Sequence, residues 1–191
     1  NVLEAMRINN IKRILFTSGS GVYGEVPNIP IPENYDEMIP ISTYGTCKLS
    51  SEALISAYSH MFEICGTVVR FANVVGPHQT HGVAYDFIRR LSNNSNELKI
   101  FGDGKQSKPY IFIDDILAAL QLLEHKFNNG FDVFNVGSSD NLTVNEIANI
   151  VIDKMNLKNT TFNFTGGARG WKADVPKYKL DTTKIRSLGW N

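Results

Sequence analysis

The sequence contains few cysteines and no excess of charge of either sign. Its 191 residues include two cysteines, Cys47 and Cys65, and 19 basic residues balance 19 acidic ones. Two cysteines do not make a disulfide framework, so we expect free thiols in a reducing compartment. No basic run suggests a nucleic-acid partner. The four histidines show no paired spacing typical of metal ligands, so no metal is expected.

Long apolar runs and glycine-rich phosphate turns are also missing. The longest apolar stretches are far too short to span a bilayer, which argues against a membrane partner. Gly19, Gly21 and Gly24 follow an apolar strand, but they lead into a proline-rich loop instead of a helix. A glycine-rich turn before a helix N-terminus cradles the pyrophosphate of a dinucleotide. This chain therefore lacks that cradle.

The sequence patterns alternate between helical and extended segments. They predict helices at about 1–9, 43–62, 83–91, 115–126 and 144–155, and strands at about 13–18, 66–72, 98–101, 109–113 and 131–136. Asp114 is expected to cap the fourth helix. Thr143 and Glu146 have the spacing of a capping box that opens the fifth. The alternation favours an α/β fold with a parallel sheet flanked by helices.

Tyr44 and Lys48 are the most informative pair of residues. Their spacing puts both side chains on one face of a helix, one turn apart. A lysine ammonium beside a phenol favours the phenolate, and a phenolate can take a proton from a sugar hydroxyl. Alone, the pair is a weak signal, because an exposed helix with an ordinary surface lysine has the same pattern.

Two strand ends strengthen the interpretation of this pair. One predicted strand breaks into small residues at 17–21, and a second ends at 71–77 with Asn73 and a Gly-Pro. Ligands of parallel sheets bind beyond the carboxyl ends of the strands. We therefore expect both strand ends and the Tyr44 helix to meet at one crevice.

Together with the segments 22–24, 102–106, 110–115, 134–137 and 170–176, these motifs resemble the extended short-chain dehydrogenase/reductases. The similarity lies in the branch of NAD-dependent epimerases/dehydratases and looks closest to UDP-glucose 4-epimerases. It covers nearly the whole chain. It implies the second half of a Rossmann-type parallel sheet flanked by helices, plus a small mixed C-terminal substrate-binding region. Residues 1–78, with 109–137 partly returning, would belong to the NAD-binding domain, and 79–191 would mainly bind a nucleotide sugar.

The resemblance also implies what this chain does not contain. We expect a fragment that lacks the first half of its dinucleotide domain and a short C-terminal piece, and that is inactive by itself. A truncated gene product without activity is the alternative. The family further implies a cytoplasmic homodimer, in which the helix at 1–9 and the Tyr44 helix pack against their mates.

The implied reaction is NAD-dependent epimerisation at C4 of a nucleotide sugar, of the UDP-glucose/UDP-galactose type. Dehydratases of the family carry Asp-Glu before Val-Tyr-Gly, whereas this chain has Ser20-Gly21, so elimination of water is not expected. Three alternatives stay open: another nucleotide-sugar epimerase, a reductase, and a non-catalytic nucleotide-binding member.

The resemblance assigns roles to individual residues. The catalytic set is Tyr44 and Lys48 with a hydroxyl from Ser18 or Ser20, because the usual Ser/Thr position holds Gly19. The implied cofactor-binding residues are Thr17, Ser18, Tyr44, Lys48, Phe71 and Val74. The implied substrate-binding residues are Asn73, Lys108, Arg169 (or Lys172 in its place) and Tyr178, the last as a gate of the sugar pocket. His78 and His81 lie near the expected substrate.

Overall fold

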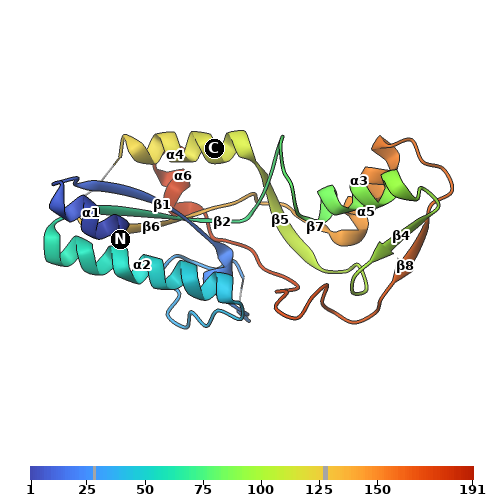
Figure 1. Ribbon diagram of the computed structural model, residues 1–191, viewed down its shortest axis with the longest axis horizontal. Helices are drawn as coiled ribbons and strands as arrows, with labels where there is room; N and C mark the ends of the chain where they lie inside the picture. Colours follow the sequence, from blue (N-terminus) through green and yellow to red (C-terminus); the bar gives the residue numbers. More distant parts are fainter. Residues whose placement is uncertain (28, 127–128) are drawn as a thin grey trace.

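The protein consists of two lobes joined by a short waist, as the computed structural model in Figure 1 shows. The structure describes residues 1–27, 29–126 and 129–191. The helices are α1 (Val2–Ile8), η1 (Ser20–Val22, a 3-10 turn), α2 (Thr43–Phe62), α3 (Val83–Asn93), α4 (Ile113–Glu124), α5 (Val144–Lys154) and α6 (Thr183–Ser187). The strands are β1 (Arg13–Gly19), β2 (Cys65–Phe71), β3 (Asn73–Val75), β4 (Glu97–Ile100), β5 (Ser107–Phe112), β6 (Phe131–Val136), β7 (Asn141–Thr143) and β8 (Thr161–Phe164).

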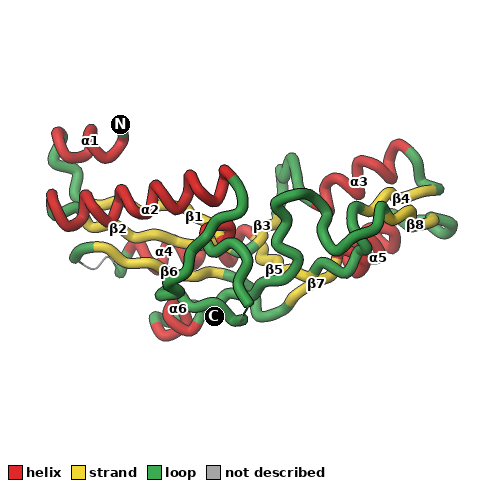
Figure 2. The backbone as a smooth tube through the Cα atoms, turned by 90° about the horizontal axis from the view of Figure 1, so that it is seen from below, coloured by secondary structure: helices red, strands yellow, loops and turns green. Residues whose placement is uncertain are grey.

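A parallel sheet in the order β1-β2-β6 forms the centre of the first lobe. The helix α2 lies against one face of this sheet and α4 against the other (Figures 1 and 2). The core between the layers is made of buried side chains that include Val69, Ile116, Ala119 and Phe134. The predicted α/β class with a helix-flanked parallel sheet is therefore confirmed.

The second lobe has its own small core. In it, α3 and α5 cover the parallel pair β4 and β8, and Phe87, Leu98 and Val151 are among the buried residues. The strand β5 pairs with β3 on one side and with β7 on the other, and these three strands form the waist between the lobes. The end of the chain returns to the first lobe, where Ile185 and Trp190 join the core.

Most predicted elements lie within a few residues of the observed ones, and the capping box is present. Glu146 N donates to Thr143 Oγ1 at 3.1 Å, and Thr143 N donates to Glu146 Oε2 at 2.7 Å. The prediction that Asp114 caps a helix is wrong. The helix α4 begins two residues earlier than predicted, at Ile113, with Phe112 at the N-cap and no side-chain cap. Asp114 instead lies in the first turn, where its charge complements the helix dipole.

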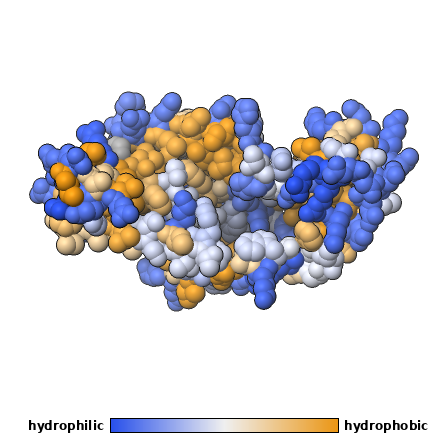
Figure 3. Space-filling model, viewed as in Figure 1, coloured by the Kyte–Doolittle hydropathy of each residue, from blue (hydrophilic) through white to orange (hydrophobic). Residues whose placement is uncertain are grey.

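Both cysteines, Cys47 and Cys65, are free thiols. No helix in the described part of the chain has the length and apolar character needed to cross a membrane. Figure 3 shows apolar side chains gathered over the first lobe near β1 and α4, and Leu117 of α4 is 48% exposed.

Gly45 allows the first turn of α2 to pack directly on η1. A Cβ atom on Gly45 would collide with the carbonyl oxygen of Gly21 and lie 2.9 Å from its carbonyl carbon. A Cβ atom on Gly21 would find only ordinary contacts, the nearest at 3.7 Å to Gly45 Cα. The close approach therefore depends on the glycine of α2 and not on that of η1.

We expect Gly45→Ala to lower the free energy of unfolding. Overpacking costs roughly 1–3 kcal/mol, and here it opposes a gain of about 1 kcal/mol in helix propensity. Because the obstacle is backbone, the cost should be at the upper end of its range. Urea unfolding measures the change, with Gly21→Ala as the matched control. Equal stability of the two variants would contradict the close contact.

Candidate functional site

A cleft of about 1010 Å³ lies between the two lobes. It opens at the carboxyl ends of β1 and β2, as expected from the strand ends. Its wall in the first lobe includes residues 18–21, Tyr44 and residues 71–75. Its wall in the second lobe includes Lys108, Tyr110, Trp171 and Asp174. The structure thus brings most of the predicted site residues to one place.

Tyr44 projects into this cleft from the first turn of α2. The N-cap Ser42 fixes that turn, since Ser42 Oγ accepts a hydrogen bond from Gly45 N at 3.0 Å. The Tyr44 side chain is 60% exposed. A ligand in the cleft can therefore reach its hydroxyl directly.

Lys48 follows one turn later and lies beside the phenol. Its Nζ donates to the carbonyl oxygen of Thr17 at 2.7 Å. The same atom is 5.7 Å from the centre of the Tyr44 ring and 4.9 Å from that of Phe16. The carbonyl of Thr17, and not its side chain, thus holds the ammonium next to the tyrosine.

Gly19 lies at the end of β1, opposite the hydroxyl of Tyr44. A Cβ atom on Gly19 would be 3.7 Å from Tyr44 Oη. A side chain at position 19 would therefore point at the reactive oxygen, as expected for the position that usually carries the hydroxyl.

The two neighbouring serines differ from each other. The Ser18 hydroxyl is buried and donates to Glu52, so it is already occupied. Ser20 lies on the cleft wall, and its hydroxyl is near the phenol of Tyr178. Of the predicted pair, only Ser20 has a hydroxyl that is not tied to the buried carboxylate.

The predicted cations of the second lobe converge on Asp174. Lys108 forms an ion pair with the Asp174 carboxylate, and Arg169 Nη1 donates to the Asp174 backbone oxygen at 2.9 Å. Arg169 also pairs with Glu25, which holds the pKa of that carboxyl below its usual range. Lys108 lines the cleft, whereas Lys172 is an exposed residue. Lys108 is thus the cation with direct access to a cleft ligand.

Two tyrosines lie at the waist under the cleft. Burial, with a smaller contribution from the Asp174 charge, raises the pKa of Tyr110 to about 12, although the nearby Asn73 side chain acts in the opposite direction. Burial also raises the pKa of Tyr178, whose ring is 7% exposed. Tyr178 Oη has no hydrogen-bond partner of normal geometry among the described residues. Such burial does not fit a gate on the pocket surface.

The remaining predicted residues fall into two groups. Phe71, Asn73, Val74 and His81 line the cleft. His78 has a positive φ of 64° in the loop after β3, and it is not among the residues that form the cleft wall in the described part of the chain.

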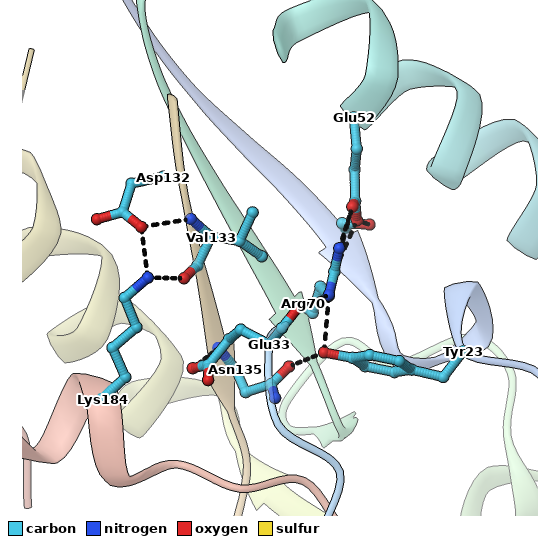
Figure 4. A network of polar contacts seen from close by, with 9 residues as sticks. Tyr23, Glu33, Glu52, Arg70, Asp132, Val133, Asn135 and Lys184 are labelled. Carbon is cyan, nitrogen blue, oxygen red and sulfur yellow. Dashed lines mark hydrogen bonds and ion pairs between the residues drawn. The ribbon is translucent and has the colours of Figure 1, made fainter. Parts of the chain in front are cut away.

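Figure 4 shows a buried polar network that joins α2, β2 and β6, which the sequence analysis did not find. Arg70 Nη2 pairs with Glu52 Oε2 at 2.7 Å, and both side chains are 3% exposed. Arg70 Nη1 donates to Tyr23 Oη at 2.9 Å, and Tyr23 Oη donates to Asn135 Oδ1 at 2.7 Å. Burial raises the pKa of Tyr23, so its hydroxyl remains a donor.

One feature of the sequence indicated this buried network. An arginine follows Val68 and Val69 within a strand that reads as buried, and buried arginine requires a charged partner. Nothing in the sequence shows that this partner is Glu52, because it comes from a helix 18 residues away. Tyr23 accordingly belongs to the core and not to the cleft wall.

The chain is similar to members of a known protein family. A family model described as the NAD dependent epimerase/dehydratase family matches residues 1–137. A putative UDP-glucose 4-epimerase of Methanocaldococcus jannaschii is 32% identical over 198 residues, which cover 100% of this chain and 61% of that protein. GDP-mannose 3,5-epimerases also match, so the relatives include more than one reaction type. The chain spans about three fifths of the M. jannaschii relative.

Solved structures show the same similarity. The crystal structure of a UDP-galactose 4-epimerase superposes with a TM-score of 0.88 at 34% identity, covering 100% of this chain and 61% of that one. The structure of MoeE5 in complex with UDP-glucose and NAD gives a TM-score of 0.87 at 27% identity, with 100% and 62% coverage.

We expect Glu52→Ala to destabilise the protein strongly. Removing one partner of a buried ion pair costs roughly 3–5 kcal/mol, because the other charge stays buried without compensation. The control is Glu4→Ala, which breaks the exposed Arg7–Glu4 pair and should change little. Urea unfolding of both variants gives the comparison. If Glu52→Ala unfolds like the control, the network is not important for stability.

Proposed function

This chain belongs to the NAD-dependent epimerase/dehydratase family, and we propose that the protein carrying it interconverts a nucleotide sugar and its C4 epimer, of the UDP-glucose/UDP-galactose type. The observation that carries the proposal is Tyr44 in the wall of a cleft between a Rossmann-type sheet and a second lobe, with Lys48 next to its ring. The similarity to UDP-glucose and UDP-galactose 4-epimerases supports the choice of substrate.

Tyr44 is the acid and base of the proposed reaction. Its Oη takes the proton of the sugar C4 hydroxyl while the C4 hydrogen leaves as hydride, which gives a 4-keto sugar. The keto sugar then rotates in the cleft, hydride returns to the other face of C4, and Tyr44 returns the proton to the C4 oxygen. Lys48 Nζ lies 5.7 Å from the centre of the Tyr44 ring, so a positive charge stands close to the phenol. An open cleft of about 1010 Å³ supports the rotation step.

NAD, when bound, supplies the acceptor and donor of the hydride. The residues present fit its nicotinamide end. Tyr44, Phe71 and Val74 line one side of the cleft, and Gly19 and Gly21 lie along the Tyr44 ring without side chains that would cover it. The chain has no glycine-rich turn for the pyrophosphate. We therefore propose that these residues, with Lys48, orient the nicotinamide end alone.

We propose that Lys108, Asn73 and Arg169 hold the diphosphate region of the nucleotide sugar. Lys108 and Asn73 line the cleft from the paired waist strands β5 and β3. Because Asp174 already pairs with Lys108, an incoming diphosphate would share this cation with a buried carboxylate. Lysine also offers a point charge and not the bidentate fork of arginine, so the diphosphate should be held less rigidly.

Two observations weigh against the other function classes. The chain has no Asp-Glu pair beside Tyr23 for a dehydratase, and a mere nucleotide-binding protein has no need of a tyrosine and lysine at the cleft. Another nucleotide-sugar epimerase or a reductase remains the second candidate, supported by the match to GDP-mannose 3,5-epimerases. Net release of oxidised cofactor during turnover would identify a reductase.

We expect Tyr44→Phe in the full-length protein to reduce kcat for UDP-galactose by roughly 100- to 10,000-fold, the range typical of a lost acid/base group. Binding of UDP should change little. The control is Tyr58→Phe on the same helix, whose hydroxyl contacts Glu4 and not the cleft. Turnover is measured as interconversion of UDP-galactose and UDP-glucose. Unchanged kcat in Tyr44→Phe would refute the mechanism, and no turnover in the parent would refute the substrate.

We also propose that the protein forms a homodimer through α1 and α2. Both helices expose large apolar side chains, with Val2 and Ile8 on α1 and Leu54 and Met61 on α2. We expect Leu54→Glu to shift the protein from dimer to monomer in sedimentation velocity, because a carboxylate would be buried at the contact. Leu117→Glu, on the opposite side of the sheet, is the control. Equal behaviour of the two variants would argue against this interface.

A further inference from the structure

The backbone does not require a glycine at position 19. Gly19 has a φ of −162°, which is extended geometry that any residue adopts. A Cβ atom there would have its nearest neighbours, Tyr44 Oη and Phe71 O, at 3.7 Å and 4.0 Å. These are ordinary van der Waals distances. The glycine therefore leaves a space, about the size of a small side chain, beside the hydroxyl of Tyr44.

The atoms around this space are polar. Tyr44 Oη can donate or accept a hydrogen bond, and the carbonyl oxygen of Phe71 has two lone pairs to accept with. Gly19 is buried as a residue and lines the cleft, so the space opens toward the cleft. An ordered water needs two to four polar partners and takes about 30 Å³. An apolar substituent in this space would make no hydrogen bond to either polar atom.

We propose that a water molecule fills the space at Gly19 and supplies the hydrogen bond that a side-chain hydroxyl at this position would make. The proposal rests on the function proposed above. The water donates one hydrogen to Phe71 O and the other to the charged Tyr44 oxygen. The sugar proton passes directly between the C4 hydroxyl and Tyr44 Oη in both directions. The water is neither consumed nor ionised, and it stabilises and aims the phenolate.

The neighbouring serines do not have to perform this task. The Ser18 hydroxyl donates to Glu52, and the Ser20 hydroxyl lies near Tyr178. The water is instead adjacent to the reacting oxygen by the geometry of Gly19. Removal of the Ser20 hydroxyl should therefore affect turnover much less than removal of the water.

The test compares Gly19→Ala, Gly19→Ser and Ser20→Ala in the full-length protein. The methyl group of alanine displaces the water without replacing its hydrogen bond, so kcat should fall roughly 10- to 100-fold, as for one lost hydrogen bond to a charged group. KM should change little. Gly19→Ser restores a hydroxyl and should keep or raise kcat. Crystal structures of the parent and of Gly19→Ala should show one water bound to Tyr44 Oη in the parent alone.

Three results would overturn the proposal. The first is Gly19→Ala with the kcat of the parent. The second is a raised KM in both Gly19 variants, which would mean that a substrate group fills the space. The third is a loss of kcat in Ser20→Ala alone. If the parent turns over no nucleotide sugar, the proposed function fails, whereas the crystal structures still decide whether the water is bound.

Discussion

The buried ion pair between Arg70 and Glu52 joins the three elements on which the site depends. Arg70 belongs to β2, Glu52 to α2, and Ser18 at the end of β1 donates to the same carboxylate. A buried carboxylate is stable only when its charge and its lone pairs are both satisfied. Here the guanidinium supplies the charge, and the Ser18 hydroxyl supplies a further donor. The network therefore fixes the end of β1 against the helix that carries Tyr44.

This packing of α2 on the sheet determines where Tyr44 lies. Glu52 lies about two turns beyond Tyr44 on α2, so the network fixes the helix against the sheet while the first turn remains free to face the cleft. Gly45 then lets that turn approach Gly21 closely, and Gly19 ends β1 at the Tyr44 hydroxyl. Gly45 thus sets the distance between α2 and η1 at the front of the site. The buried Glu52–Arg70 pair joins α2 to β2 behind it (Figure 4).

The second lobe also contains a buried carboxylate, that of Asp174. Asp174 is 4% exposed, and Lys108, Arg169 and the Gly170 amide all contact it. The Asp174 carboxylate therefore holds Lys108, and the Asp174 backbone oxygen holds Arg169. Because the carboxylate neutralises part of the Lys108 charge, an anionic ligand in the cleft would meet less positive charge.

The sequence by itself determined the order of helices and strands, the capping box and the pairing of Tyr44 with Lys48 on one helix face, because these depend on neighbours a few residues apart. It also indicated a crevice at the ends of two strands. Only the tertiary structure decided that Ser18 is bound to Glu52, that Tyr178 is buried, and that Gly19 faces the Tyr44 hydroxyl. The three-residue strands β3 and β7 likewise arise from pairing with β5. Each of these depends on contacts between residues far apart in the chain, which a local pattern does not encode.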